Sequence, residues 1–556
     1  MSALLPLLTS AAVVLREHAD IFALHHVVHA VSAYLDASPQ WTIPRAAQRG
    51  HVHLLDHLLS LTSSDDSDKR HCHNDDDNHD LDKWEAQFEK AMCKAARCGQ
   101  LRAMQWLELH YQPAHNVNVR GAMNEAVHHC GDMDIIRWLD YHYPDDLCDP
   151  HSLERAAANG YTHVLQWFLE HRRWEWSAMI GFMNPLNAAV ANGRLETVVW
   201  LHTVAKRHLF TASLMTIAAE HGHVHVMEWL QTQSSSNSGS SSISWLSTAM
   251  DNAAKNGHLH VLQWLDLNYQ NHAKATTQAM DLAAANGHLQ VLQWLHHRTQ
   301  GEGCTTKAMD GAAANGHFAV VQWLHQNRHP EELIATVGVN PRDQSQRSLL
   351  ILATDALDNA AAGGFLDAVQ WLHANRPQDG CTTRAMDQAA ANGHLNVVQW
   401  LHEHRSEGCT TEAMDKAASH GHLSVFQWLH DNRSEGCTTN AMDAAAREGH
   451  LEVVQWLHRH RSEGCTTDAM DDSAIRGHLS VFQFLHENRR EGCTVKAATH
   501  AAMKGRLDVL AFIFHNHRDV IDLVEVRGVS RSCSRVDILT WLHGIAMRPA
   551  TAGAPV

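Results

Sequence analysis

Two short segments of the chain bring together residue types that bind metal ions. His25 and His29 are four residues apart, so on a helix they would lie on one face. The other segment contains His71, Cys72, His73 and His79 among aspartates. No glutamate follows His25 as in the HExxH motif of zinc enzymes, and the second segment has the charge density of a solvated loop. We therefore expect no cofactor and no structural metal here, and metal handling by His-rich loops is the least favoured of three functions.

The remaining histidines do not indicate catalysis. The chain has 48 of them, and most recur at fixed places in a repeating pattern. Those of the Trp-Leu-His motif, such as His402 and His430, are predicted at the end of a helix, where a partly positive ring would favour the negative end of the helix dipole. No phosphate-binding glycine loop, GxSxG elbow or kinase motif set occurs. The sequence predicts a protein that is not an enzyme.

A repeat of constant length organises the chain. Gly393, Gly421, Gly449, Gly477 and Gly505 follow one another at intervals of 28 residues. Similar glycines at less regular intervals raise the number of repeats to fifteen. A fixed period between 20 and 50 residues is typical of a solenoid, in which each unit packs against its neighbours.

The segment from Glu407 to Ser434 shows what one repeat contains. Thr410 or Thr411 can cap a short first helix that begins near residue 411. Asp415 is expected in its first turn, where a negative charge suits the helix dipole, and Met414 begins an apolar face with the two alanines at 417 and 418. Gly421 is expected to end this helix with a positive φ angle.

A second helix is predicted to start at residue 422 or 423. Its apolar residues include Val425, Phe426 and Leu429, a surface too broad to be left exposed. Twelve of the 18 tryptophans, among them Trp428, occupy one position of this helix, and we expect them in the core. Neither helix can bury its apolar face alone, so the repeat needs neighbours.

The run AMDKAASHGHLSVFQWL resembles the helix pair of ankyrin repeats. Met414, Ala417, Gly421 and Val425 match the family's pattern, whereas Asp415 replaces its histidine and the repeat is about five residues shorter than the usual 33. The resemblance implies an all-α fold, an ankyrin-type α-solenoid of helix-turn-helix repeats with shortened fingers, in which EGCTT makes a tight turn. This variety is similar to ankyrin arrays of oomycetes, which include candidate secreted effectors.

Composition shifts divide the chain into ten segments. We predict N-terminal capping helices at 1–40, a first repeat at 41–60, an acidic His/Asp-rich disordered loop at 61–83, and irregular repeats at 84–231. A Ser-rich loop at 232–247 and a loop at 329–352 interrupt regular repeats at 248–328 and 353–518. A C-terminal cap at 519–547, closed by a lone helix at 536–545, and a tail at 548–556 complete the prediction.

Charge and cysteine placement restrict the partners and the compartment. The net charge of −17 repels phosphate backbones and acidic bilayers, so we expect neither nucleic acid nor membrane as a partner. Six of the twelve cysteines recur at the finger, one per repeat. Neighbouring repeats stack about 10 Å apart, beyond the roughly 7 Å that a disulfide spans. Reduced thiols indicate a cytoplasmic protein.

The N-terminal run from Ala3 to Leu15 is the one hint of another compartment. It is apolar enough for a signal peptide, but no basic residue precedes it and no clear cleavage site follows. Secretion is therefore the alternative to a cytoplasmic location. No apolar run reaches the length of a transmembrane helix.

Positions that change between repeats predict the binding surface. Glu412, Lys416 and His420 follow i, i+4, i+8 spacing on the first helix, opposite its apolar face. The resemblance to ankyrin repeats places this stripe on the concave face that holds partners. The predicted site consists of Lys307, Asn315, Arg384, Gln388, Asn392, Glu412, Lys416, His420, Asn440, Glu448, Asp468, Asp472 and Arg476. Alternatively, these positions vary only because a solvated helix face tolerates any polar residue.

A second series pairs an arginine with a glutamate two residues later, as in Arg405 and Glu407. We expect these pairs to link neighbouring repeats, each contributing at most about 1 kcal/mol.

The sequence thus favours a non-enzymatic scaffold or adaptor, monomeric and without cofactor, that binds protein partners on the concave face of an ankyrin solenoid. The mixed charges of the stripe suit a folded protein or peptide. The alternative is a secreted effector that uses the same array to bind a host protein.

Overall fold

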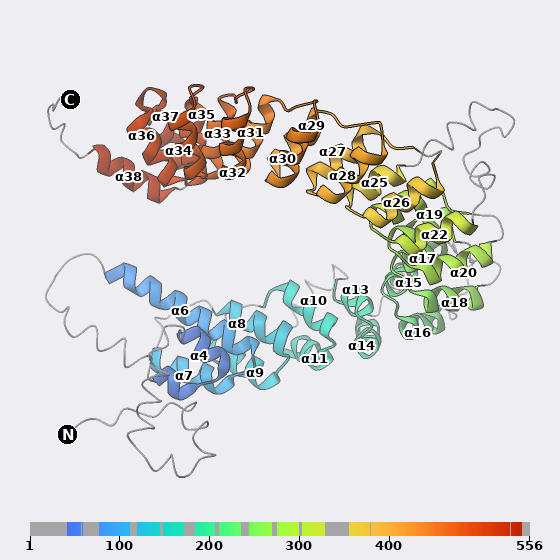
Figure 1. Ribbon diagram of the computed structural model, residues 1–556. Helices are drawn as coiled ribbons and strands as arrows, with labels where there is room; N and C mark the ends of the chain where they lie inside the picture. Colours follow the sequence, from blue (N-terminus) through green and yellow to red (C-terminus); the bar gives the residue numbers. More distant parts are fainter. Residues whose placement is uncertain are drawn as a thin grey trace, which may run out of the picture. The chain divides into compact units, whose positions relative to one another are not determined.

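Helices form all the regular structure in the described part of this computed structural model (Figure 1). The described residues are 42–56, 58, 77–111, 119–144, 148–171, 184–205, 211–234, 244–269, 275–299, 303–327, 355–377, 380–533 and 535–546. They belong to two compact units, residues 1–249 and 250–556. The boundary lies within α17 (Ser244–Lys255).

Each unit is a series of helix pairs. The first helices of unit 1 are α4 (Ile43–Arg49), α6 (Asp77–Arg97), α8 (Arg120–Glu125) with the π-helical turn η2 (Ala126–Cys130), α10 (Pro150–Asn159), α13 (Asn184–Ala191) and α15 (Thr211–Glu220). Its second helices are α7 (Leu101–Tyr111), α9 (Met133–His142), α11 (Thr162–His171), α14 (Leu195–Ala205) and α16 (Val224–Ser234).

Unit 2 is more regular. Its first helices after α17 are α19 (Thr277–Ala285), α21 (Thr306–Ala314), α25 (Ala356–Ala362), α27 (Thr383–Ala391), α29 (Thr411–Ser419), α31 (Thr439–Glu448), α33 (Asp468–Arg476), α35 (Val495–Lys504) and α37 (Leu523–Ser532). Its second helices are α18 (Leu259–Asn268), α20 (Leu289–Thr299), α22 (Phe318–Asn327), α26 (Leu366–Asn375), α28 (Leu395–His404), α30 (Leu423–Asn432), α32 (Leu451–His460), α34 (Leu479–Asn488), α36 (Leu507–Asn516) and α38 (Val536–Ala546). A 3-10 turn, η3 (Arg518–Val520), follows α36.

Local signals in the sequence set the first helix of each repeat. The Thr410 side chain accepts a hydrogen bond from the backbone N–H of Glu412 and caps α29, which satisfies one donor of the open first turn. The backbone of Gly421 has a φ angle of 76°. A Cβ atom at this position would also lie 2.6 Å from Nδ1 of His450 in the next repeat, so only glycine fits. The predicted cap and stop signals are confirmed.

A bidentate hydrogen bond joins one repeat to the next. Asp415, 6% exposed, accepts from the backbone N–H of Thr438 (2.8 Å) and from its hydroxyl (2.7 Å). Thr438 in turn caps α31. Asp415 was expected in the first turn of its helix, where its charge would favour the helix dipole. In the structure it instead links two neighbouring repeats. The same bond joins Asp251 to Thr276, Asp281 to Thr305, Asp358 to Thr382, Asp387 to Thr410, Asp443 to Thr466 and Asp471 to Thr494.

The core lies between the two helices of each pair and between neighbouring pairs. Met414 is 2% exposed, and Val425, Phe426 and Leu429 are fully buried. The repeated tryptophans differ from the prediction, because Trp428 and most of its equivalents are only half-buried. Trp428 packs edge-on against His402 of the preceding repeat, with ring centroids 5.2 Å apart. The same contact is made by Trp229, Trp323, Trp371, Trp400 and Trp456.

The finger arginines connect repeats in a different way from that predicted. Arg433 pairs with Glu435 of its own finger, not with a neighbouring repeat. Its Nη1 atom donates to Nδ1 of His402 in the preceding repeat (3.3 Å), and Arg405 and Arg461 do the same with His373 and His430. Because arginine has no acceptor atom, the ring nitrogen is the acceptor in each of these contacts between repeats.

The finger cysteines face the same arginines. Cys409 is buried beside Arg433, and burial raises the pKa of its thiol to about 11. Cys437 and Cys465 share this environment. Such thiols are protonated and poorly nucleophilic at neutral pH. Residues 405–410 contain bends and no strand, which confirms the predicted short finger.

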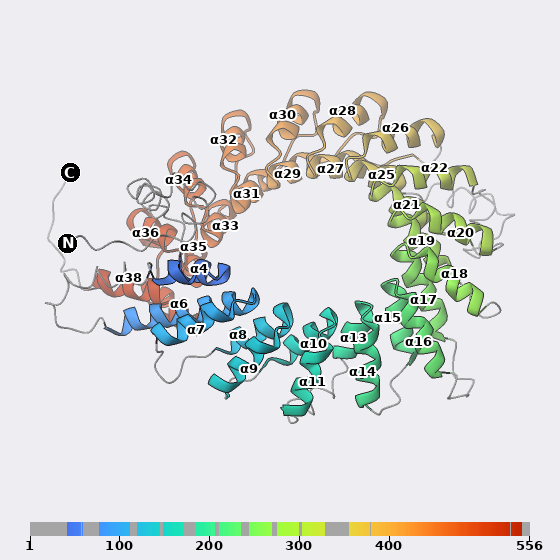
Figure 2. The ribbon, with the colours of Figure 1, turned by 90° about the horizontal axis from the view of Figure 1, so that it is seen from below.

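The first helices of unit 2 lie on its concave side. In Figure 2, α25, α27 and α29 follow the inner edge of the unit, whereas α26, α28 and α30 follow the outer edge. Neighbouring first helices contact each other extensively, and neighbouring second helices touch over a much smaller area. The small alanines of the first helices permit this close approach.

Several predicted segment boundaries differ from the structure. Helix α6 begins at Asp77, inside the predicted loop 61–83, and α17 begins at Ser244, inside the predicted Ser-rich loop. The predicted lone C-terminal helix, α38, is paired with α37 and completes a further repeat. The predicted caps at 1–40, the insertion at 329–352, the tail at 548–556 and the side chains of His25, His29, His71, Cys72, His73 and His79 lie outside the residues described.

Among the described helices, none combines the length and the apolar character that crossing a bilayer requires.

We expect Asp415→Ala to destabilise unit 2 by about 1–3 kcal/mol, because the substitution leaves the backbone donor of Thr438 without its buried partner. Urea unfolding followed by circular dichroism measures this change. The matched control is Asp431→Ala on the exposed surface of α30, for which a change within about 0.5 kcal/mol is expected. Equal midpoints for both variants would show that the inter-repeat bond contributes nothing.

The finger ion pairs predict a pH dependence. Desolvation acts to raise the pKa of Glu491, but hydrogen bonds from Arg489 outweigh it and lower the pKa to about 2. A folded-state pKa below the ordinary value means that the stabilisation is complete above about pH 4.5 and is lost as the pH falls towards 2. The difference in unfolding midpoint between the native chain and Glu491→Gln should shrink over that interval. Exposed Glu487→Gln is the control, and a difference that persists unchanged at pH 2 would contradict the interpretation.

Candidate binding face of the first helices

The predicted polar stripe separates into three rows with different environments. Row one is the residue directly before the Ala-Met-Asp motif, and consists of Lys307, Arg384, Glu412, Asn440 and Asp468. All five are exposed. Each donates its backbone N–H to the capping threonine of its helix, at 3.2 Å. The cap fixes the backbone while leaving the side chain free to vary.

Row two lies four residues further and packs between helices. It contains Gly311, Gln388, Lys416, Ala444 and Asp472. Ala444 is 2% exposed, and a Cβ atom at Gly311 would lie 2.7 Å from Cβ of Ala285 on the preceding first helix. Gln388, Lys416 and Asp472 are half-buried. Row two therefore adjusts the fit between neighbouring first helices more than it presents a surface.

Row three serves partly as a cap for the preceding repeat. It contains Asn315, Asn392, His420, Glu448 and Arg476. The amide of Asn315 donates to the Ala285 carbonyl (2.7 Å), and that of Asn392 donates to the Ala362 carbonyl (2.8 Å). These two asparagines bind the open C-terminal end of the preceding helix, whose carbonyls lack helical partners.

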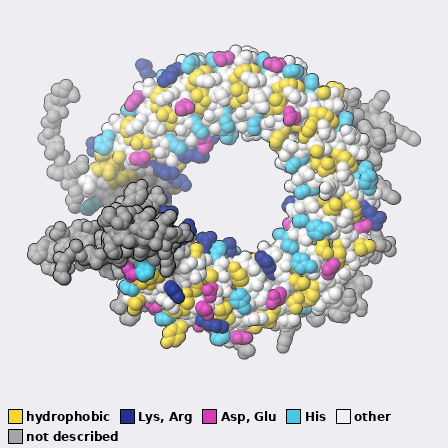
Figure 3. Space-filling view, turned by 60° about the horizontal axis from the view of Figure 1, so that its bottom comes forward, with side chains coloured by type: hydrophobic (Ala, Val, Ile, Leu, Met, Phe, Trp, Pro, Cys, Tyr) yellow, Lys and Arg dark blue, Asp and Glu magenta, His cyan; other side chains and the backbone are white. Residues whose placement is uncertain are grey.

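Charges along the rows are mixed in sign and only partly paired. Lys416 pairs with Glu412, and Arg476 pairs with Glu448 across two repeats at 2.7 Å. The side chains of Lys307 and Asp468 make no ion pair with any described residue. Figure 3 shows the same mixture, since basic, acidic and histidine side chains are interspersed over its visible face. Such a surface offers many separate polar contacts, and its electrostatic potential is not of one sign throughout.

Burial affects the acids of this face. Desolvation raises the pKa of Asp472, while Arg447 acts to lower it. Desolvation also raises the pKa of Asp387 and Asp443, whose threonine hydrogen bonds act in the opposite direction. In Asp387 and Asp443 the threonine hydrogen bonds therefore offset part of the effect of burial on the carboxyl pKa.

Four further positions of row one were not predicted from the sequence. They directly precede the same alanine in their repeats and are exposed: Thr248, Gln278, Asp355 and Lys496. Asp355 lies 3.5 Å from Arg384 of the next repeat. The position before the Ala-Met-Asp motif would have identified Thr248 and Gln278, and the variants Ala-Leu-Asp and Ala-Ala-Thr would have identified the other two.

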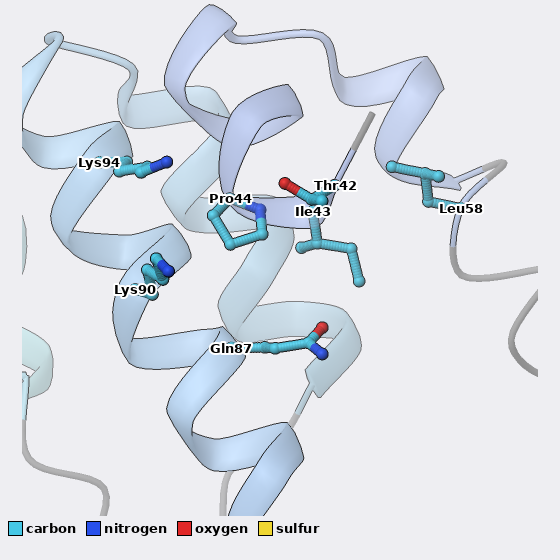
Figure 4. A pocket seen from close by; sticks show the side chains of 7 residues that line it. All are labelled: Thr42, Ile43, Pro44, Leu58, Gln87, Lys90 and Lys94. Atoms are coloured by element: carbon cyan, nitrogen blue, oxygen red, sulfur yellow. The ribbon is translucent and has the colours of Figure 1, made fainter. Parts of the chain in front are cut away.

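A pocket of unit 1 lies apart from these rows. Thr42, Ile43, Pro44, Leu58, Gln87, Lys90 and Lys94 line it (Figure 4). Its polar groups are two amines, one amide and one hydroxyl. The lining includes no carboxylate, imidazole or thiol, so it lacks the acid–base pairs that hydrolytic chemistry uses.

Metal-ligand side chains come together at one place within the described residues. Glu125, His128 and His129 of unit 1 have ligand atoms within 4.8 Å of one another. This cluster was not predicted from the sequence, although the spacing i, i+3, i+4 indicates one face of a helix.

Comparison with known families identifies the repeat. A family model described as ankyrin repeats, present in many copies, matches residues 153–202, 250–296, 280–325, 357–402, 386–430 and 414–458. The chain contains ankyrin repeats. Each match runs from a first helix to the second helix of the following repeat, which confirms the predicted all-α ankyrin solenoid. Ankyrin repeats indicate a scaffold for protein interactions.

Comparisons with individual proteins add little. No curated protein matches the chain. Solved structures similar to it include the pentatricopeptide repeat protein PPR10 from maize, with a TM-score of 0.29, 12% identity, and coverage of 84% of this chain and 74% of that one. The same protein in complex with an 18-nt psaJ RNA element gives a TM-score of 0.28, 11% identity, and coverage of 84% and 80%. Likeness at this level gives no ground for inferring a shared function.

Rows one and two should respond differently to the same substitution. Asn440→Lys is expected to change the free energy of unfolding by less than about 0.5 kcal/mol, because row one is exposed. Ala444→Lys is expected to cost about 1–3 kcal/mol or more, because a long side chain must enter a packed contact between helices. Urea unfolding of both variants measures the contrast. If the two variants were equally stable, row two would be as open as row one.

Proposed function

We propose that this chain is a non-enzymatic adaptor that binds a folded protein or peptide through row one and the adjoining fingers of unit 2. One observation carries the proposal: row one holds a different exposed side chain in almost every repeat, on a backbone that the threonine cap keeps the same. A constant frame with a variable exposed row suits recognition.

The chemistry of row one favours a protein partner. Its members include lysine, arginine, glutamate, asparagine and aspartate, at successive sites about 10 Å apart. Protein interfaces combine both signs of charge at their polar rim, whereas a nucleic-acid surface would require clustered cations. The net charge of −17 also disfavours a nucleic-acid partner, because it repels the phosphate backbone.

The existing ion pairs of the face are compatible with binding. Arg384 and Glu412 lie in exposed pairs, which contribute at most about 1 kcal/mol each. A partner can therefore replace these contacts at small cost. Lys307 and Asp468 can contact a partner without breaking an ion pair, since they have no ionic partner among the described residues.

A cytoplasmic, monomeric adaptor is the form that we propose. The secreted-effector alternative changes the compartment in which the partner is met, and leaves the binding face the same. Mature protein in the medium that lacks its first residues would favour secretion. The thiol environment of Cys409, buried and without a disulfide, suits a reducing compartment.

Affinity purification of the full chain from cells that express it tests the proposal. The test variant exchanges charges in row one, Lys307→Glu with Asp468→Lys, and the control exchanges them on exposed sites of second helices, Asp431→Lys with Arg459→Glu. Both variants keep the net charge of the native chain. We expect the native chain and the control to recover the same partner, and the row-one variant to recover about tenfold less, equivalent to about 1.4 kcal/mol.

Two outcomes would contradict this function. Recovery of the partner by all three proteins in equal amounts would place the contact elsewhere. No partner recovered by the native chain would remove the adaptor proposal itself. Circular dichroism of each variant verifies that the helices are intact.

A further inference from the structure

In the repeat that contains α8 and η2, the segment from the methionine of the first helix to the glycine that ends it is longer by one residue than in a regular repeat. Met414 precedes Gly421 by seven residues in a regular repeat, whereas Met123 precedes Gly131 by eight. The structure accommodates the extra residue in a π-helical turn over Ala126–Cys130. In that turn the Gly131 N–H donates to the Ala126 carbonyl at 2.8 Å. Single π-helical turns are rare and are frequently found at functional sites.

The π turn brings three ligand-type side chains to one point. Nε2 of His128 lies 3.8 Å from Oε2 of Glu125, and Nε2 of His129 lies 3.5 Å from the same oxygen. The two imidazole rings are 4.0 Å apart between centroids. All three residues are half-buried.

This cluster is poorly satisfied by the protein itself. Oε2 of Glu125 and Nδ1 of His128 are buried and have no hydrogen-bond partner among the described residues. A buried carboxylate oxygen without a partner is destabilising, and a cation bound at Oε2 of Glu125 would supply the interaction that this oxygen lacks.

We propose that Glu125, His128 and His129 bind one divalent transition-metal ion, with Zn²⁺ as the best-suited ion. Imidazole nitrogen and carboxylate oxygen bind Zn²⁺ at about 2.0–2.2 Å, and a His₂Glu set with water in the fourth position is a known zinc geometry. Tetrahedral ligands at that distance are about 3.3 Å apart. The separations of 3.5 and 3.8 Å between the nitrogens and Oε2 need only small side-chain adjustments.

Two neighbouring arginines repel a cation at this site, and one of them can move away from it. Nε of Arg97 lies 3.8 Å from Oε2 of Glu125, and Arg155 also contributes positive charge near both rings. The Arg97 side chain is 56% exposed, so it can turn into water when the metal binds.

Glu125, the last residue of α8, occupies a position that corresponds to one of the polar rows on the first helices of unit 2. It follows the methionine of its Ala-Met pair by two residues, as the row-two residues do in unit 2. The extra residue of the π turn lies after Glu125. The metal would therefore lie on the side of α8 that corresponds to the polar rows of unit 2. It would fix a first helix that departs from regular α-helical geometry.

Zinc binding by the untagged full chain tests the site. The protein is stripped with a chelator, dialysed and titrated with Zn²⁺, and Co²⁺ absorption in the visible range reports the coordination. The variants are Glu125→Gln, His128→Gln, His129→Gln and the triple substitution. The control is His296→Gln with His297→Gln, an adjacent pair on α20 for which the described residues provide no third ligand.

We expect the native chain and the control to bind one equivalent of Zn²⁺ that the triple variant lacks. Each single variant should bind that equivalent at least about tenfold more weakly, because it loses a direct ligand. Any binding by the loop at 65–82 is common to all variants and cancels in the comparison. If the triple variant fails to fold, the zinc affinity of the isosteric variant Glu125→Gln is compared with that of the native chain instead. The proposal is overturned if the triple variant retains the native equivalent at native affinity, or if the native chain retains none.

Discussion

In unit 2, the carboxylate of one repeat accepts two hydrogen bonds from the threonine that caps the first helix of the next. This contact does two things at once: it satisfies a cap, and it sets the distance and direction of the following helix. The apolar face of a single helix pair cannot be buried within that pair. The Asp415–Thr438 bond and its equivalents therefore position the surfaces whose burial stabilises the array.

Much of the fold follows from local signals in the sequence. The 28-residue period, the Thr410 cap and the positive φ of Gly421 depend on residues within one repeat, and all are found in the structure. Contacts between repeats were harder to predict. Helical spacing shows that Asp415 and Arg433 lie near a neighbouring repeat, but it does not show whether their partner is a cap, a ring or an ion in the same finger.

The polar stripe of the first helices was predictable from the sequence, but its division into three rows was not. The i, i+4, i+8 pattern identifies residues that share a helix face. It does not show how closely the next first helix approaches, and that approach is what buries Ala444 and engages Asn392. The cluster at Glu125 was missed for a related reason, since its π turn arises from one inserted residue that a search for regular periods ignores. Row one is exposed in every regular repeat and varies in side chain between repeats, and the proposed recognition rests on it.

Site-specific photocross-linking tests this assignment most directly. A benzophenone amino acid is placed at Asn440, in row one, or at Ser424, on the exposed side of α30, and the full chain is irradiated in cells that express it. We predict a cross-linked protein from position 440 and none from position 424. A cross-link from position 424 alone, or with equal yield from both, would contradict a binding face built from the first helices.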